Sequence, residues 1–340
     1  MANKLQFPIL PVPVTDGMPG GMMMTDREIQ DGMVFLVGEL EKQDPKLHEP
    51  LSSVTWARDL PVLTGGGWVD SVSVVDVSYA TSGGSNGGVF AGEANEFPMI
   101  QADIGKEGLR TLQWGQTLKV PFIDQQKLQK IGRNLEDILN RGLHLAYDKT
   151  IDRNAYIGFT EFGTYGLLND PNIITVMAAP ATEGGEDTAW EKKTPYQILE
   201  DVNRLLRMTW EASEYDLSGM SDHILLPPKK YTYLVETEIS PGSGMSILNY
   251  LLQNNLAHNQ NRDLVIAPSQ WCVGAGTGGK DRIAAYCNRD DRVRFHQTVP
   301  LQRLMTQASA AHVAYLTPYA SQFTPVEWVY RQHAMYMDGI

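Results

Sequence analysis

Cysteine and long apolar runs are what this sequence of 340 residues most lacks. Only Cys272 and Cys287 occur, which excludes a disulfide framework and is typical of small buried side chains in a reducing cytoplasm. Residues 1–15 contain one lysine and a short apolar run broken by prolines, which fits neither a signal peptide nor a membrane-spanning helix. The sequence therefore predicts a cytosolic product with no disulfides and no membrane segment.

Positive charge is also scarce. Lys and Arg total 28 against 40 Asp and Glu, so the formal net charge is −12. Proteins that coat nucleic acid phosphates need clustered Lys and Arg, and the composition disfavours that class. With 42% hydrophobic residues and a mean hydropathy of −0.26, the chain has the composition of a folded protein with a sizeable core.

Proline and glycine are concentrated near the start of the chain. Prolines 8, 11, 13 and 19 and the glycines around them predict an extended arm with little to fold on by itself. Beyond it, residues 28–43 have apolar side chains at helical spacing, and Thr25-Asp26 supplies a cap. We therefore expect an arm followed by a helix.

Two later segments alternate between polar and apolar residues, as half-buried strands do. They are residues 68–80 and 111–122, separated in part by the glycine-rich stretch 81–98. We expect the two strands to pair as a long hairpin with a flexible tip. The alternation slips by one residue at Val74-Val75, which predicts a β-bulge there.

The strongest helical pattern runs from Asp124, as N-cap, to about Ile157, with Gly158 as the stop. Its apolar face includes Leu128, Ile131, Leu135 and Ile138. One unbroken helix of this length would measure roughly 50 Å. A compact globule of this chain length has a diameter of about 50 Å. The pattern therefore predicts an elongated molecule.

From about residue 160 the pattern is that of a mixed α/β lobe. Helices are predicted at 194–213, which Thr194-Pro195 opens, and at 246–255. Strands are predicted at 223–228, 263–268, 282–287, 293–299, 312–316 and 326–331.

Residues 274–281, GAGTGGKD, match two phosphate-binding patterns in part. A working phosphate loop needs a following helix and, after the lysine, a hydroxyl residue to hold Mg²⁺. Asp281 occupies that hydroxyl position, and the next residues read as a strand. We therefore interpret the stretch as a glycine-rich strand connection.

Other candidates for chemistry are equally weak. His144, Asp148 and Asp152 are spaced four residues apart on the long helix and suit either a metal site or a face of hydrogen-bonding side chains. The sequence has no G-x-S-x-G elbow, and either cysteine would need a paired histidine to act as a nucleophile. The sequence predicts no enzyme, no cofactor and no metal.

A resemblance supplies the missing function. After the long helix comes YIGFTEFGTYGLLNDPNIITV (156–176), which contains Gly166-Leu167-Leu168-Asn169. Residues 123–176 resemble the major capsid proteins of tailed bacteriophages with the Hong Kong 97-type fold, in which such a turn and a short strand follow a spine helix. The run NRDDRVRFHQTVPLQRL (288–304) is similar to the closing segment of relatives in that group.

The resemblance implies an α+β fold, the Hong Kong 97-type capsid fold, and the order of elements agrees over nearly the whole chain. The implied parts are an N-terminal arm (1–45), an extended loop with flanking peripheral-domain strands (46–123), the spine helix of the peripheral domain (124–159), an axial domain (160–295) and a returning peripheral β-segment (296–340).

The implied function is that of a major capsid protein. Copies of the chain would form hexamers and pentamers of an icosahedral virion shell around the phage genome, assembled in the host cytoplasm. The implied partners are the chain itself, a portal, separate scaffold or decoration proteins, and double-stranded DNA held by loose non-specific contact. An encapsulin-like nanocompartment shell, which shares the fold, is the alternative. A cytosolic α/β enzyme that uses loop 274–281 is a further one.

The residues expected to serve assembly or to shape the fold follow from the same comparison. Those of the extended loop, which would lie across an adjacent subunit, are Val72, Val77, Tyr79, Trp114 and Leu118. Those that would bind the spine helix to the peripheral sheet are Leu128, Ile131, Leu135 and Ile138. Those of the turn after the helix are Gly166, Leu167, Leu168 and Asn169.

Overall fold

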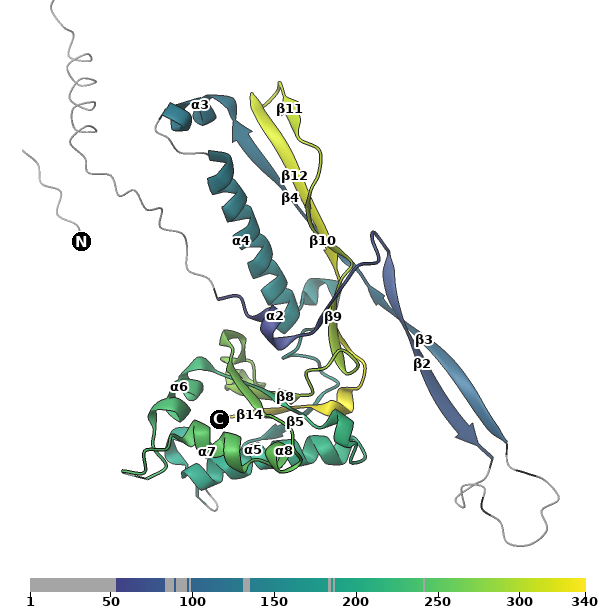
Figure 1. Cartoon of the computed structure of the whole chain (residues 1–340), viewed down its shortest axis with the longest axis vertical. Helices are drawn as coiled ribbons and strands as arrows, with labels where there is room; N and C mark the ends of the chain where they lie inside the picture. The colour runs from purple at the N-terminus through teal and green to yellow at the C-terminus, as the bar shows by residue number, and fades with distance from the viewer. Residues whose placement is uncertain are drawn as a thin grey trace, which may run out of the picture. The chain divides into compact units, whose positions relative to one another are not determined.

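The computed structural model has an α+β architecture, as predicted (Figure 1). It describes residues 53–82, 89, 97, 99–130, 135–182, 185, 187–240 and 242–340. The predicted arm, the predicted helix at 28–43 and most of the predicted hairpin tip lie outside the described residues. All elements below belong to the unit 52–340.

A five-stranded mixed sheet has the strand order β5-β14-β8-β6-β7. Its strands are β5 (Ile174–Met177), β14 (Ala334–Asp338), β8 (Arg282–Tyr286), β6 (His223–Leu226) and β7 (Val265–Pro268). β14 is parallel to β5 and antiparallel to β8, and β6 is antiparallel to β8 and parallel to β7. The three central strands, β14, β8 and β6, are buried throughout because both faces of the sheet are covered.

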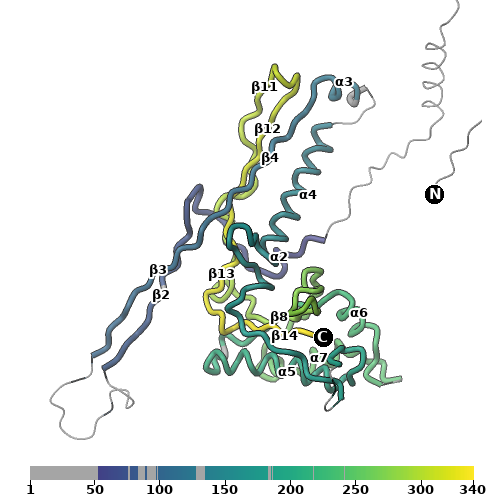
Figure 2. Tube along the Cα trace, turned by 180° about the vertical axis from the view of Figure 1, so that it is seen from behind, coloured from purple at the N-terminus to yellow at the C-terminus, as the bar shows by residue number. Residues whose placement is uncertain are grey.

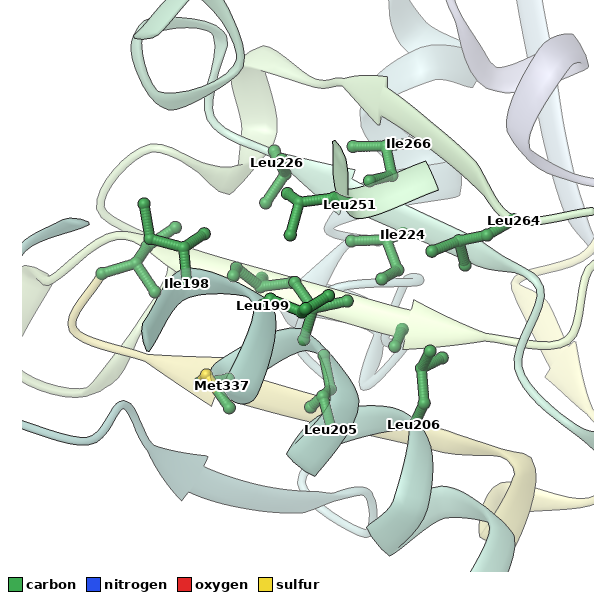
Figure 3. Close-up of a cluster of buried hydrophobic side chains, with 14 of the residues drawn as sticks. Ile198, Leu199, Leu205, Leu206, Ile224, Leu226, Leu251, Leu264, Ile266 and Met337 are labelled. Atoms are coloured by element: carbon green, nitrogen blue, oxygen red, sulfur yellow. The ribbon is translucent and has the colours of Figure 1, made fainter. Parts of the chain in front are cut away.

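Alternate residues of this sheet enter two different cores. Ile224 and Leu226 join Ile198, Leu205 and other apolar side chains around the helices (Figure 3). Leu225, between them, belongs to a second cluster on the opposite face, together with Tyr156 and Leu167. The period of two along a strand therefore divides the apolar run HILL between two layers.

The helices are α2 (Trp56–Asp59), α3 (Phe122–Lys130), α4 (Leu135–Tyr156), α5 (Pro195–Ala212), α6 (Pro228–Glu236), α7 (Ile247–Asn254) and α8 (Leu256–Asn259). The predicted start of α5 is confirmed: Thr194 caps it with a capping box to Gln197, and Pro195 occupies the first turn. α5 lies against β14 and β8. α7 is also confirmed, with Ser246 as N-cap.

A four-stranded antiparallel sheet packs against α4. Its strands are β4 (Leu112–Pro121), β12 (Ala314–Phe323), β10 (Val299–Arg303) and β11 (Gln307–Ser309), with β12 paired to each of the others. Leu118, Val120, Leu143 and Tyr319 form the core between this sheet and α4. A smaller sheet has the order β1-β9-β13, made of Val62–Thr64, Val293–Gln297 and Val326–Trp328.

The last sheet is a two-stranded ribbon, β2 (Ser71–Thr81) and β3 (Ile100–Arg110), which run side by side in Figures 1 and 2. It corrects two predictions. The partner of 68–80 is residues 100–110, whereas the predicted partner, 111–122, forms β4 and pairs with β12. The register is continuous from Ser71 to Thr81, so the predicted bulge at Val74-Val75 is wrong.

The start of the helix predicted from Asp124 to about Ile157 is also corrected. The structure describes two helices, α3 and α4, with residues 131–134 outside the described residues. Asp124 lies in the first turn of α3, which begins at Phe122, so it is not the N-cap. α4 has 22 residues, a length of roughly 33 Å. It ends at Tyr156, and Gly158 follows with a φ of +74°, in agreement with the predicted stop.

The C-terminal end differs from the predicted division at residue 296. β9 belongs to the small sheet and β10 to the four-stranded sheet, but β14 belongs to the five-stranded sheet. Its side chains enter both cores of that sheet, which explains why this segment is fully buried.

Candidate assembly surfaces

The β2–β3 ribbon exposes one apolar face. Because the register is continuous, Val75, Val77 and Tyr79 lie on one face with Ile100 and Ile104 of the opposite strand. These side chains are largely exposed: Tyr79 by 76%, Ile104 by 68% and Val77 by 47%. Side chains of this size leave water when a partner is available, so this outer face has the character of a binding surface.

The inner end of the ribbon has its apolar residues on the opposite face. Val72 and Val74 are half-buried, and Val74 and Leu109 line the same crevice as Val326 and Trp328 of β13. The slip of the alternation at Val74-Val75 therefore reflects a change in which face of the ribbon is buried, because Val74 lies on the covered face and Val75 on the exposed one. Val72 and Val77, predicted to act together, lie on opposite faces.

The inner end is held by the side chain of Gln322, which is buried in β12. Its amide accepts a hydrogen bond from Val69 N at 3.0 Å and donates to Val69 O at 2.6 Å. It also donates to Thr111 Oγ1, and Thr111 in turn donates to Val69 O. This pairing fixes where both strands of the ribbon leave the sheet.

The turn that follows α4 is an internal joint. At Gly166, a β-carbon would lie 2.4 Å from the Ile157 nitrogen and the Tyr156 carbonyl carbon. Asn169 accepts a hydrogen bond from Gly166 N at 2.8 Å, and Leu167 and Leu168 are fully buried. Tyr336 of β14 and Arg282 of β8 donate to the carbonyls of Leu167 and Leu168. The four turn residues thus connect α4 to the five-stranded sheet.

A second joint is centred on Asp59, which is completely buried. Its carboxylate accepts hydrogen bonds from the Arg58 guanidinium at 2.6 and 2.8 Å, from Tyr156 OH, and from His223 Nε2 at 3.2 Å. Tyr286 OH donates to the Asp59 carbonyl at 2.6 Å. Burial raises the pKa of Tyr156, and the Asp59 carboxylate raises it further, so the phenol keeps the proton that it donates. The side chain of Asp59 thereby links α2 to α4 and β6, and its backbone carbonyl links α2 to β8.

Those of the remaining predicted side chains that the structure describes lie between α4 and the four-stranded sheet. Trp114 packs edge-on against Tyr147 of α4 at 5.0 Å, and Leu118 lies in the core beneath the helix. Leu135 packs on that same core, and Ile138 is half-buried. Ile131 and the side chain of Leu128 lie outside the described residues. Trp114 and Leu118 thus belong to the body, not to the ribbon where they were predicted.

Two backbone N–H groups of loop 274–281 are already hydrogen-bonded to carboxylates. Gly274 N donates to Asp281 Oδ1 at 3.0 Å, and Thr277 N donates to Asp338 Oδ2 at 2.8 Å. Strand β8 follows directly, as predicted. The loop therefore presents carboxylates where a phosphate would need N–H groups.

One of the possible metal ligands on α4 has another role. Asp152 accepts hydrogen bonds from Thr55 N and Trp56 N, and from Trp271 Nε1 at 2.6 Å. Among the residues that the structure describes, no group of His, Cys, Asp and Glu is arranged to hold a metal ion. Within the same part of the chain, no helix is both long and apolar enough to cross a bilayer.

We expect both thiols to be unreactive in the folded chain. Cys272 and Cys287 are buried, and burial raises the pKa of the Cys287 thiol to about 12. Because the thiolate is the reactive form, a chromogenic disulfide reagent at pH 8 should label neither residue in the native protein. It should label both after denaturation. Rapid labelling of the native chain would contradict the burial of these residues.

Comparison with known proteins agrees with this arrangement. Residues 86–340, more than half of the chain, match the family model described as major capsid protein. The chain belongs to the major capsid protein family. It is therefore a structural, shell-forming protein of the virion capsid and not an enzyme, as predicted. The search of curated proteins found no match.

Solved structures show the same fold for this capsid protein. The capsid of Myoviridae phage XM1 matches with a TM-score of 0.72 at 15% identity, over 94% of this chain and 100% of that one. The capsid of a native GTA particle matches with a TM-score of 0.60 at 10% identity, over 88% and 96%. A virus-like particle from Pyrococcus furiosus matches with a TM-score of 0.51 at 12% identity, over 83% and 91%. The Hong Kong 97-type fold is thus confirmed, and the family match favours a phage capsid over the encapsulin-like alternative.

Proposed function

We propose that this capsid protein assembles into hexamers and pentamers of an icosahedral shell, and that the outer face of the β2–β3 ribbon binds an adjacent subunit. The observation that carries the proposal is the exposure of Val75, Val77, Tyr79, Ile100 and Ile104 on one face. Full burial of a large apolar side chain is worth about 1.5–3 kcal/mol, so this face would contribute several kcal/mol to each contact.

The roles that we propose for the segments of the chain are those of the corresponding segments in the family. We propose that residues 1–45 act as an arm, 46–123 as the extended loop with flanking strands, 124–159 as the spine region and 160–295 as the axial domain. β14 belongs with the axial part because it pairs with β5 and β8. The rest of 296–340 is assigned to the peripheral part.

The other partners are proposed from the same reasoning. The shell would be assembled in the host cytoplasm, with a portal and with separate scaffold or decoration proteins. It would enclose double-stranded DNA. A net charge of −12 per chain suits a container that touches its DNA loosely, because a strongly basic lining would hold the phosphates.

A single charge on the outer face tests the proposal. We expect Val77→Asp to leave the subunit folded, since Val77 is 47% exposed in the single chain, but to abolish particles, since an unpaired carboxylate would be buried in each contact. Negative-stain microscopy and sedimentation would measure particle formation, and circular dichroism would report folding.

Ala80→Asp is the matched control. Ala80 is exposed on the opposite face of the same strand, across from Gln101. We expect its particles to resemble the wild type. Normal particles from Val77→Asp would refute the assignment of this face, and the absence of particles from the wild-type chain would refute self-assembly.

A further inference from the structure

A buried histidine lies at the connection between two sheets. The short 3-10 helix η7 (Arg331–His333) joins β13 of the small sheet to β14 of the five-stranded sheet. Its last residue, His333, is 4% exposed. The His333 carbonyl accepts hydrogen bonds from Cys287 N at 3.3 Å and from Ser221 Oγ at 3.2 Å. The placement of this residue therefore fixes how the chain passes from one sheet to the other.

The packing of the His333 ring suits its neutral form. The ring lies against Gly219, where an added β-carbon would be 2.3 Å from Nε2 and 2.6 Å from Nδ1. Nδ1 is buried and has no hydrogen-bond partner among the described residues. Nε2 lies 3.9 Å from Asp216 Oδ2, too far for a hydrogen bond. An imidazolium has two N–H donors, and a buried donor without an acceptor is costly, so this packing does not accommodate a second ring proton.

The charged groups around the ring act in the same direction. Arg292 donates to Asp216 Oδ2 at 3.0 Å, so the carboxylate nearest to the ring is already paired. Burial lowers the pKa of His333 below its ordinary value of about 6.5, and the charge of Arg292 lowers it further. The carboxylates of Asp216 and Asp291 raise this pKa only in part. At neutral pH the ring is therefore uncharged.

A pocket of about 340 Å³ beside the ring offers it a second position. The polar residues that line the pocket are Ser213, Glu214, Asp216, Arg292, Tyr330, Gln332 and His333. Glu214 is exposed, so the pocket is open to solvent on that side. An imidazolium that turned into the pocket would be hydrated and would face the carboxylates of Glu214 and Asp216. The protonated ring thus has a better place outside its buried position than within it.

We propose that protonation of His333 in mild acid turns the ring into this pocket and opens the connection between β13 and β14. The closed arrangement excludes the second ring proton and the open one binds it, so a falling pH favours opening. With a depressed folded-state pKa, the closed arrangement is fully favoured above about pH 6.5 and loses that advantage as the pH falls to the folded value. Within that window the ratio of open to closed chains rises by at most about tenfold per pH unit. The device lies within one subunit and does not depend on the proposed assembly.

Amide hydrogen exchange of the full chain at pH 7.5 and pH 5.0, measured by mass spectrometry, tests this inference. The reporters are peptides that contain Cys287, Val329 and His333, whose N–H groups donate to carbonyls at this connection. Their exchange rates are first corrected for the intrinsic pH dependence of amide exchange. We expect protection of these peptides in the wild type to fall about fivefold or more at pH 5.0. Peptides of α4 and β4 should keep their protection.

His333→Gln removes the titrating group, so its protection at the reporter peptides should be the same at both pH values. His312→Gln is the matched control, because His312 is exposed between β11 and β12 and the variant should show the wild-type fall. Three results would overturn the inference: unchanged protection in the wild type, an equal fall in His333→Gln, or an equal fall in α4 and β4.

A second measurement decides the question if His333→Gln does not fold. The exchange of the ring C2–H of each histidine in the wild type reports its own titration. We expect His333 to titrate below pH 6.5, with a midpoint that coincides with the loss of amide protection at the connection. A midpoint at or above pH 6.5, or one that does not coincide with that loss, would overturn the inference.

Discussion

Gly166→Ala is expected to destabilise the subunit by about 3 kcal/mol or more, because backbone atoms, not flexible side chains, occupy the space that a methyl group needs. The added carbon would lie 2.4 Å from the Ile157 nitrogen and the Tyr156 carbonyl carbon. Moving them apart would pull Leu167 and Leu168 away from the second core. Denaturant unfolding followed by circular dichroism measures the loss.

Gly142→Ala supplies the control. Gly142 is exposed within α4, and a β-carbon there would have nothing within 4 Å. Alanine in a helix interior is favoured over glycine by about 1 kcal/mol, so this variant should unfold at slightly higher denaturant. If both variants unfolded like the wild type, the close approach at Gly166 would be refuted.

Asp59→Asn is expected to cost about 3–5 kcal/mol, as does removal of one partner from other buried ion pairs. An amide keeps the shape of the carboxylate, but its NH₂ group faces donors, and the Arg58 guanidinium loses its counter-charge. The link between α2, α4 and β6 weakens as a result. The free energy of unfolding at pH 7 measures the effect, and Asp103→Asn on the exposed ribbon is the control, with no expected change.

The same residue predicts a pH dependence. Burial alone would raise the pKa of Asp59, but hydrogen bonds from Arg58, His223 and Tyr156 outweigh it and hold the pKa below the ordinary value. A depressed folded-state pKa stabilises the fold above the unfolded-state pKa of about 3.9 and loses that contribution as the pH falls through the folded value. The stability difference between the wild type and Asp59→Asn should therefore narrow below about pH 4. A constant difference down to pH 2 would contradict this.

Two of the elements that could be predicted have one covered face. β4 alternates because α4 covers Leu118 and Val120 while Thr117 and Lys119 remain exposed. α5 was predicted because its capping residues and apolar stripe lie within one short segment. β3 was missed because its residues are exposed on both faces, so no burial imposes alternation on IQADIGKEGLR.

The ribbon that carries the proposed assembly surface was predicted only in part. The strand that carries Val77 and Tyr79 was identified, but its partner was assigned to β4, whose alternation is stronger. No sequence pattern predicted the joint at Asp59. Its partners, Tyr156, His223 and Tyr286, are far from Asp59 in the sequence and meet it only in the folded chain.

The apolar side chains of β2 change from one face of the ribbon to the other between Val74 and Val75, so the two halves of the strand face different surroundings. Near Val72 its side chains pack against the ribbon's own subunit, and from Val75 outward we propose that they contact an adjacent subunit. If that proposal holds, mutations in the outer half are expected to change the strength or geometry of subunit contacts while each subunit keeps its own fold.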